Sequence, residues 1–285
     1  MLVSERIGQL FLDTGDRLEY TEYGGGDRWV VLLPAPLMPR RMQQPLARAL
    51  AGDGLHVVTL DLLGHGRSDR PADPLAYSVT HFAEQVVALL DHLGAEQAVV
   101  GGVSLGGNVA LEVAALAPER VRGLIVEGPV LDNALTTGLL VLAPLMFAAR
   151  FVPFTVAGVR KVTKVVPRGL VPFWVGIGLD ACNQRPKSMA AVVHGVLFGR
   201  MAPSSSARRR IAVPALVVGH PADPLHRTTD ALMLADELPG SRFLKAHNVL
   251  EWRVAPDRLD AAAVAFAQEC WDAAGARRRG RGVAR

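Results

Sequence analysis

The sequence of 285 residues has little cysteine and lacks the opening features of a secreted protein. Its two cysteines, Cys182 and Cys270, have a spacing that fits no metal motif, and nothing indicates the secretory context of a disulfide framework. The first residues, MLVSER, lack the long apolar core of a signal peptide. We therefore expect a reduced, cytoplasmic protein, and the residues imply no metal and no organic cofactor.

Aromatic residues are also few, at 6%, although half of all residues are hydrophobic. The core must consist mostly of Leu, Val and Ala, and a chain of this length can form one α/β unit. The net charge of +4 includes five arginines in the last ten residues. Because no zinc-ligand cluster, RNA motif or basic recognition helix accompanies them, we expect residues 276–285 to be a disordered tail and exclude a nucleic-acid partner.

Short apolar runs alternate with stretches of helical periodicity along most of the chain. Strands are expected at residues 9–13, 18–23, 29–33, 56–60, 98–102, 121–126, 215–219 and 242–246. Helices are expected at residues 41–51, 79–93, 105–116, 229–238 and 256–274. Continuous apolar strands separated by helices of this length indicate parallel βαβ units covered on both faces. The expected fold class is α/β, with a mostly parallel sheet of eight strands flanked by helices.

The alternation stops after the sixth strand, between residues 131 and 210. Residues 133–149 carry no charge, are slightly too short to span a membrane, and contain Pro144. We expect this insertion to be a helical cap that packs on the main domain and over an apolar pocket. The predicted domains are a core of residues 1–130 and 211–275, a cap of residues 131–210, and a basic tail of residues 276–285.

The cap also has the composition of an interfacial helix, because basic residues lie beside apolar ones. These basic residues are Arg150, Arg160, Lys161, Lys164 and Arg168. A helix of this kind suits weak contact with a membrane surface, and the same charges would favour an anionic substrate. Packing over the pocket is the simpler interpretation, and both stay open.

The strongest chemical signal is the sequence GVSLG at residues 102–106, which follows a buried strand and opens a helix. A sharp strand-to-helix turn lifts the serine above the sheet, and the flanking glycines prevent clashes in a strained backbone. Ser104 is therefore the candidate nucleophile, and the backbone N–H of Leu105 is the natural first oxyanion donor. The alternative is that Ser104 only caps the helix.

These residues give the chain a resemblance to the α/β-hydrolase superfamily, in its cap-bearing esterase and lactonase-like branch. The sequence DLLGHGRSD at residues 61–69 resembles the loop after the fourth strand, and residues 211–219 resemble the seventh strand. The insertion falls where that family carries its cap. His65 lies in the loop motif, where a structural role is the expected one. Ser104 in place of an aspartate nucleophile argues against an epoxide hydrolase or a haloalkane dehalogenase.

The resemblance implies an acid and then a histidine after Ser104 in chain order. Asp223, just past the seventh strand, matches the acid motif, with Glu127 as a reserve acid and a turn aspartate as the structural alternative. Of the two later histidines, His226 is expected at a helix start and too near Asp223 to lie in the last loop. His247 is therefore the candidate base, although its loop is four or five residues shorter than is usual in the family.

The oxyanion loop departs from the family pattern as well. The usual His-Gly pair after the third strand is replaced by LPAPLM at residues 33–38. Pro36 has no N–H to donate, so Leu37 becomes the candidate second donor. One missing donor typically costs a factor of about 10²–10³ in rate.

Two functional hypotheses follow. In the first, a serine hydrolase cleaves a lipophilic ester, lactone or thioester through an acyl-enzyme on Ser104, with a small hydrophobic substrate as its partner. In the second, an incomplete triad leaves a ligand-binding scaffold or a non-hydrolytic lyase or cyclase.

Overall fold

The computed structural model describes residues 3–131 and 135–282, and within them eight strands form one sheet in the order β1-β2-β4-β3-β5-β6-β7-β8. β1 pairs antiparallel with β2, and β2 with β4, whereas every other neighbouring pair is parallel. The strands are β1 Glu5–Phe11, β2 Arg17–Tyr23, β3 Trp29–Leu33, β4 His56–Asp61, β5 Ala98–Val103, β6 Val121–Glu127, β7 Ala215–Gly219 and β8 Ser241–Lys245. The predicted fold class, a mostly parallel eight-stranded sheet with a helical insertion after the sixth strand, is confirmed.

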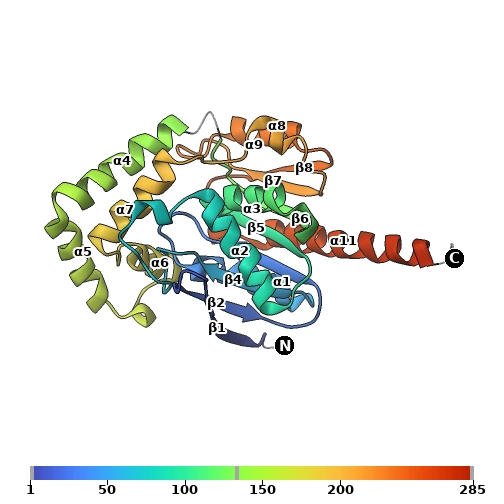
Figure 1. The fold of residues 1–285 in the computed structure, drawn as a ribbon, viewed down its shortest axis with the longest axis horizontal. Helices are drawn as coiled ribbons and strands as arrows, with labels where there is room; N and C mark the ends of the chain where they lie inside the picture. The colour runs from blue at the N-terminus through green and yellow to red at the C-terminus, as the bar shows by residue number, and fades with distance from the viewer. Residues whose placement is uncertain (1–2, 132–134, 283–285) are drawn as a thin grey trace.

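Helices cover both faces of this sheet (Figure 1). On one face, α1 (Gln44–Gly52) and α11 (Asp257–Gly282) bury leucine, alanine and phenylalanine side chains against the strands. On the other face lie α2 (Val79–Leu93), α3 (Leu105–Leu116) and α9 (Thr228–Glu237). The bounds of α2 and α3 agree with the periodicity in the sequence. Ser78 caps α2 by accepting the His81 N–H, and Gly94 ends it in the left-handed conformation.

The insertion after β6 forms the cap. Its helices are α4 (Leu135–Phe151), α5 (Pro153–Val165), α6 (Phe173–Ala181), α7 (Pro186–Phe198) and α8 (Ser205–Arg208). Of these, α7 carries much of the packing on the main domain, since five of its apolar side chains are buried. Asn108 of α3 donates to the carbonyl oxygens of Val130 and Met201, at 2.8 and 2.7 Å, and so fixes both ends of the cap to the core.

The C-terminal helix α11 continues to Gly282 and so includes the start of the expected tail at residues 276–285. The disorder of that tail stays a prediction. Alanine and arginine both have high helix propensity, so the composition that suggests a solvated tail also supports a helix. Residues 283–285 lie outside the described part of the chain.

Candidate active site

Ser104 occupies a strained turn between β5 and α3. Its backbone has φ +55° and ψ −118°, and its N–H donates to the Glu127 carbonyl oxygen at 2.9 Å. Neither flanking glycine could carry a side chain without a clash. A Cβ on Gly106 would lie 2.5 Å from the Leu33 carbonyl oxygen, and one on Gly102 would lie 2.5 Å from the Gly106 carbonyl carbon. The motif therefore adopts the nucleophile-turn geometry expected from the sequence.

Backbone strain is concentrated at the same edge of the sheet. Among the described residues, the non-glycine positions with positive φ are Leu37, Ser104 and Ala222. They follow β3, β5 and β7, whose carboxyl ends all lie at this edge. Such conformations cost about 1–3 kcal/mol each and persist where the surrounding structure enforces them, typically at functional sites.

Asp223 binds a histidine, and that histidine is His226. Asp223 Oδ2 lies 3.0 Å from His226 Nδ1. Asp223 Oδ1 accepts hydrogen bonds from the backbone N–H groups of Leu225 and His226 at 2.8 and 3.0 Å. Burial by itself would raise the pKa of Asp223. The hydrogen bonds from His226 and from these N–H groups outweigh burial and lower the pKa to about 2. An ionised Asp223 favours the tautomer of His226 that carries its proton on Nδ1 and leaves Nε2 as an acceptor.

The lowered pKa of Asp223 predicts a pH-dependent contribution to stability. The ordinary value is 3.8 and the folded value about 2, so the stabilisation is present above pH 3.8 and is lost as the pH falls through 2. Allowing for partial solvent screening, we expect Asp223→Asn to lower the free energy of unfolding by about 1–2 kcal/mol at pH 6. Urea denaturation at pH 6 and near pH 2 measures this. The two proteins should converge at the lower pH, and a constant difference would contradict the assignment.

Ser104 and His226 line the same small cavity, of about 80 Å³, between the core and the cap. The rest of its lining is Pro36, Leu105, Val130, Gly138, Leu142, Val196, Leu197, Met201 and Leu225. The His226 ring reaches this cavity across Gly128, where an added Cβ would lie 3.1 Å from His226 Cγ. No hydrogen bond joins Ser104 to His226 among the described contacts, and such catalytic bonds often tighten only when substrate binds.

His247, the histidine that the sequence favours as base, lies elsewhere. Its side chain is 73% exposed, and its Nδ1 lies 3.3 Å from Glu251 Oε1. It is not part of the cavity lining that holds Ser104, and it has no contact with Asp223 among the described residues. Its assignment as the base stays an untested prediction, while the structure places Ser104, Asp223 and His226 together.

The reserve acid, Glu127, belongs to a separate buried cluster. It binds Arg253 at 2.7 and 2.8 Å and His220 Nε2 at 2.9 Å. Burial alone would raise the pKa of Glu127 and lower that of His220, but this pairing reverses both shifts. His220 Nδ1 lies 3.2 Å from the Asn248 carbonyl oxygen. Both nitrogens of His220 are therefore engaged, which leaves neither to accept a proton from Ser104.

The oxyanion loop keeps the defect seen in the sequence. Leu105 and Pro36 both line the cavity, and Pro36 has no N–H. Leu105 opens α3, so its N–H has no acceptor within the helix. Leu37 is buried with φ +63°, and its carbonyl oxygen accepts from Gln184 of the cap at 2.9 Å. The roles of Leu105 and Leu37 as donors stay predictions.

His65 is a buried structural residue. Its Nδ1 lies 2.9 Å from the Leu63 carbonyl oxygen, and its ring packs edge-on against Phe82. Burial lowers its pKa to about 4, so the ring is neutral near pH 7. No group of three or more histidine, cysteine or acidic side chains is placed to hold a metal within the described ranges.

The sequence argues against His226 as a partner of Ser104 because it is only three residues from Asp223. Ala222 in the left-handed conformation and the turn closed by Asp223 Oδ1 allow one carboxylate to bind both the backbone and the ring of His226. A usable signal was Gly128 directly after the sixth strand, since the missing side chain gives the ring its space.

Comparison with known proteins shows the family and the fold of the chain. A family model described as alpha/beta hydrolase fold matches residues 28–185, which is more than half of the chain. The protein belongs to the alpha/beta hydrolase fold family. The chain is 43% identical over 84 residues to 2-hydroxymuconate semialdehyde hydrolase from Pseudomonas putida. This match spans 29% of the chain and 30% of that enzyme.

Solved structures show the same fold over nearly the whole chain. The enol-lactonase from Burkholderia xenovorans LB400 matches with a TM-score of 0.74 and 21% identity, over 92% of this chain and 100% of that one. An esterase from Exiguobacterium antarcticum matches with a TM-score of 0.74 and 17% identity, over 91% and 98%. Proteins similar to this chain thus include esterases, lactonases and carbon–carbon bond hydrolases. Because these two solved structures are at most 21% identical to the chain, they show the shared fold and nothing more.

Proposed function

We propose that this alpha/beta hydrolase is a serine hydrolase of lipophilic small-molecule esters, lactones or thioesters, with His226 rather than His247 as the base. The observation that carries the proposal is that His226 binds Asp223 through Nδ1 and lines the cavity of Ser104. In this proposal Asp223 orients His226, and His226 takes the proton of Ser104 across the cavity that both residues line, as acyl transfer requires.

The chemistry follows from these contacts. Ser104 Oγ attacks the substrate carbonyl and transfers its proton to His226 Nε2, while Asp223 stabilises the resulting imidazolium. The Leu105 N–H stabilises the oxyanion at the start of α3. His226 returns the proton to the leaving group, and water then releases the acyl group from Ser104 by the same steps. The apolar lining from α4 and α7 favours a lipophilic acyl group.

A trapping experiment tests this proposal directly. The protein is mixed with p-nitrophenyl esters of increasing chain length, quenched in acid within one turnover, and examined by intact-protein and peptide mass spectrometry. We expect an acyl adduct on the peptide that contains Ser104. Release of p-nitrophenol with no adduct, or an adduct on another residue, would contradict the acyl-enzyme.

One observation favours the second candidate, a ligand-binding scaffold or a lyase or cyclase. Pro36 lines the cavity where the family usually supplies an oxyanion donor. A weakened oxyanion site is tolerated if no tetrahedral intermediate forms. This candidate predicts that the protein's product, or its bound apolar ligand, persists when Ser104 is replaced by alanine.

A further inference from the structure

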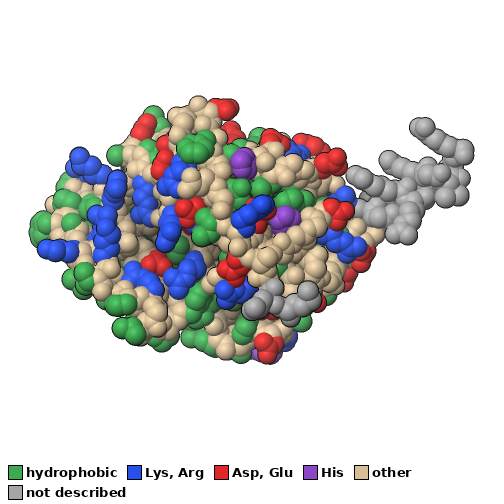
Figure 2. All heavy atoms as spheres, turned by 90° about the horizontal axis from the view of Figure 1, so that it is seen from below, with side chains coloured by type: hydrophobic (Ala, Val, Ile, Leu, Met, Phe, Trp, Pro, Cys, Tyr) green, Lys and Arg blue, Asp and Glu red, His purple; other side chains and the backbone are tan. Residues whose placement is uncertain are grey.

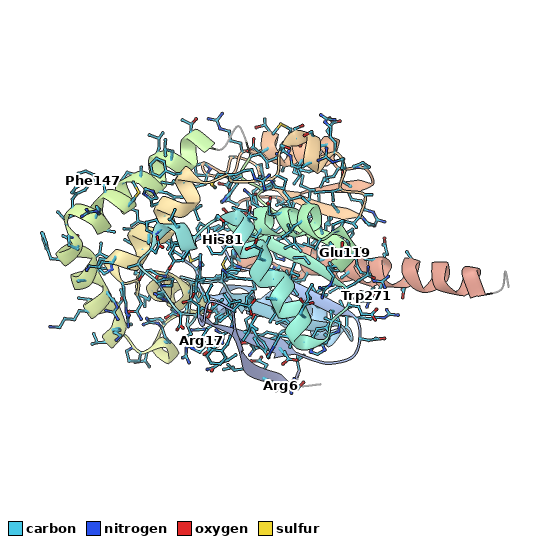
Figure 3. All side chains as sticks on the ribbon, in the orientation of Figure 1. Arg6, Arg17, His81, Glu119, Phe147 and Trp271 are labelled. Carbon is cyan, nitrogen blue, oxygen red and sulfur yellow. The ribbon has the colours of Figure 1, made fainter. Side chains whose placement is uncertain are left out.

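The outer helices of the cap expose an unusual amount of apolar surface. On α5, Thr163 is the buried side chain, while Phe154, Val162 and Val165 are 72%, 65% and 75% exposed. On α4, Leu140, Phe147 and Phe151 are 60–70% exposed. These helices form the outer rim of the molecule in Figure 1, and Phe147 points outward from it in Figure 3. We call the exposed side of α4 and α5 the rim face.

The cap that carries the rim face is strongly basic. Residues 131–210 contain eleven lysines and arginines but two acidic residues, Asp132 and Asp180. Asp180 is already paired, with Arg41 at 3.2 Å and Arg168 at 2.7 Å. No carboxylate in the described ranges pairs with Arg160, Lys161 or Lys164 of α5. Figure 2 shows basic side chains gathered at the cap end, interleaved with hydrophobic ones.

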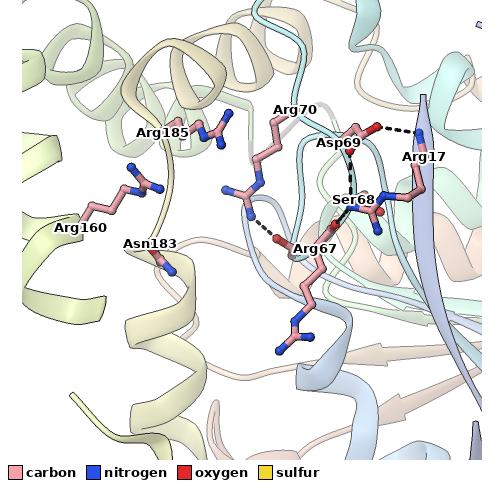
Figure 4. Close-up of a pocket in the computed structure, with 9 residues that line it drawn as sticks. Arg17, Arg67, Ser68, Asp69, Arg70, Arg160, Asn183 and Arg185 are labelled. Atoms are coloured by element: carbon pink, nitrogen blue, oxygen red, sulfur yellow. Dashed lines mark hydrogen bonds and ion pairs between the residues drawn. The ribbon is translucent and has the colours of Figure 1, made fainter. Parts of the chain in front are cut away.

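Beside α5 lies a cationic hollow of about 290 Å³, which shares no lining residue with the Ser104 cavity. It is lined by Arg17, Gly66, Arg67, Ser68, Asp69, Arg70, Arg160, Asn183 and Arg185. Figure 4 shows the guanidinium groups of Arg70, Arg160 and Arg185 directed into the same space. The one carboxylate, Asp69, accepts the Arg17 N–H at 2.9 Å and lies 3.4 Å from its guanidinium.

The hollow carries a surplus of positive charge, with five arginines and one carboxylate among its described lining residues. The Arg160 Nε–H, a donor, is buried without a hydrogen-bond partner among the described residues. Burial is the main cause that lowers the pKa of Arg70. The Asp61 carboxylate opposes this shift, whereas the positive charges of Arg185 and Arg160 add to it. Crowded guanidinium groups are stabilised by a phosphate, which accepts several of their hydrogen bonds at once.

The hollow continues into an apolar groove that leads to the rim face. Arg70 and Arg185 line both spaces, and the groove adds Pro153, Phe154 and Ala157 from the start of α5. A site with guanidinium groups at one end and apolar side chains at the other matches an amphiphile that has an anionic head.

A bilayer fits the rim face better than a protein partner does. Protein interfaces are depleted in lysine at their core, whereas Lys161 and Lys164 alternate here with Val162 and Val165. Long lysine side chains can reach the headgroup layer while apolar neighbours enter the acyl region. The cap's excess of positive charge complements an anionic leaflet.

We propose that the cap docks on an anionic phospholipid bilayer, with the rim face in the interface and a lipid phosphate in the hollow of Arg70, Arg160 and Arg185. Docking places α4, which lines the Ser104 cavity through Gly138 and Leu142, against the layer that holds lipophilic substrates. The binding itself does not depend on the proposed hydrolysis.

Vesicle sedimentation tests the proposal with the full chain. We expect binding to equimolar phosphatidylcholine and phosphatidylglycerol vesicles, and little binding to phosphatidylcholine alone. The double variant V162D/V165D should bind roughly tenfold more weakly, since it places charge in the interface, and R160E should weaken binding similarly. Phe11→Asp on β1, where Phe11 is 64% exposed, and Lys245→Glu on β8 are the matched controls and should bind like the wild type.

Three results would overturn the docking proposal. One is wild-type protein that stays in solution with anionic vesicles, and another is equal binding by V162D/V165D and Phe11→Asp. The third is calorimetric binding of inorganic phosphate without vesicle binding, which would assign the hollow to a soluble anion. Ser104→Ala should bind vesicles normally, so failure of the hydrolase proposal leaves this result unaffected.

Discussion

Ser104→Ala is expected to lower kcat/KM for any hydrolysed ester by roughly 10⁶-fold, to the level left by binding and the oxyanion site alone. In the proposed mechanism the serine oxygen forms the acyl bond, and no other described residue of the cavity lining carries a hydroxyl. Steady-state turnover of the best p-nitrophenyl ester measures the loss.

Ser206→Ala is the matched control, because Ser206 is exposed on α8 and contacts Ser204 at 3.1 Å. It should turn over substrate like the wild type. If Ser104→Ala retains turnover in a folded sample, the acyl-enzyme mechanism is wrong and the scaffold or lyase alternative takes its place.

His226→Ala is expected to lower kcat by roughly 10⁴- to 10⁶-fold, with a much smaller change in KM. The variant removes the acceptor of the Ser104 proton and leaves the apolar lining in place. It also removes the hydrogen bond that fixes Asp223 Oδ2, so circular dichroism should confirm that the variant is folded.

His247→Ala is the comparison that separates the two histidines. The side chain is 73% exposed and contacts Glu251, so we expect kcat within about threefold of the wild type, as for surface substitutions in general. A large loss in His247→Ala with activity retained in His226→Ala would restore the assignment suggested by the sequence.

The fold could be predicted because its signals are local. A few neighbouring residues are enough to predict each element. Examples are the apolar strand Trp29–Leu33, the helix Val79–Leu93 with its serine cap, and the serine turn at residue 104. Alternation of such elements then limits the topology to parallel βαβ units.

The place of His226 could not be predicted because it depends on contacts between distant segments. The ring of His226 packs against Gly128, almost a hundred residues earlier, where an added Cβ would lie 3.1 Å from His226 Cγ. Family resemblance pointed to the last loop, where His247 instead binds Glu251. The pairing of Glu127 with Arg253 and His220 likewise joins three segments that no local pattern connects.

The central claim is that His226 and Asp223 activate Ser104, and the rate of fluorophosphonate labelling tests it most directly. The probe reports an activated serine without knowledge of the substrate, and peptide mapping locates the adduct. We predict rapid labelling of Ser104 in the wild type and in His247→Ala, and labelling slowed by at least about 10³-fold in His226→Ala. Rapid labelling in His226→Ala, or none in folded wild-type protein, would contradict the account.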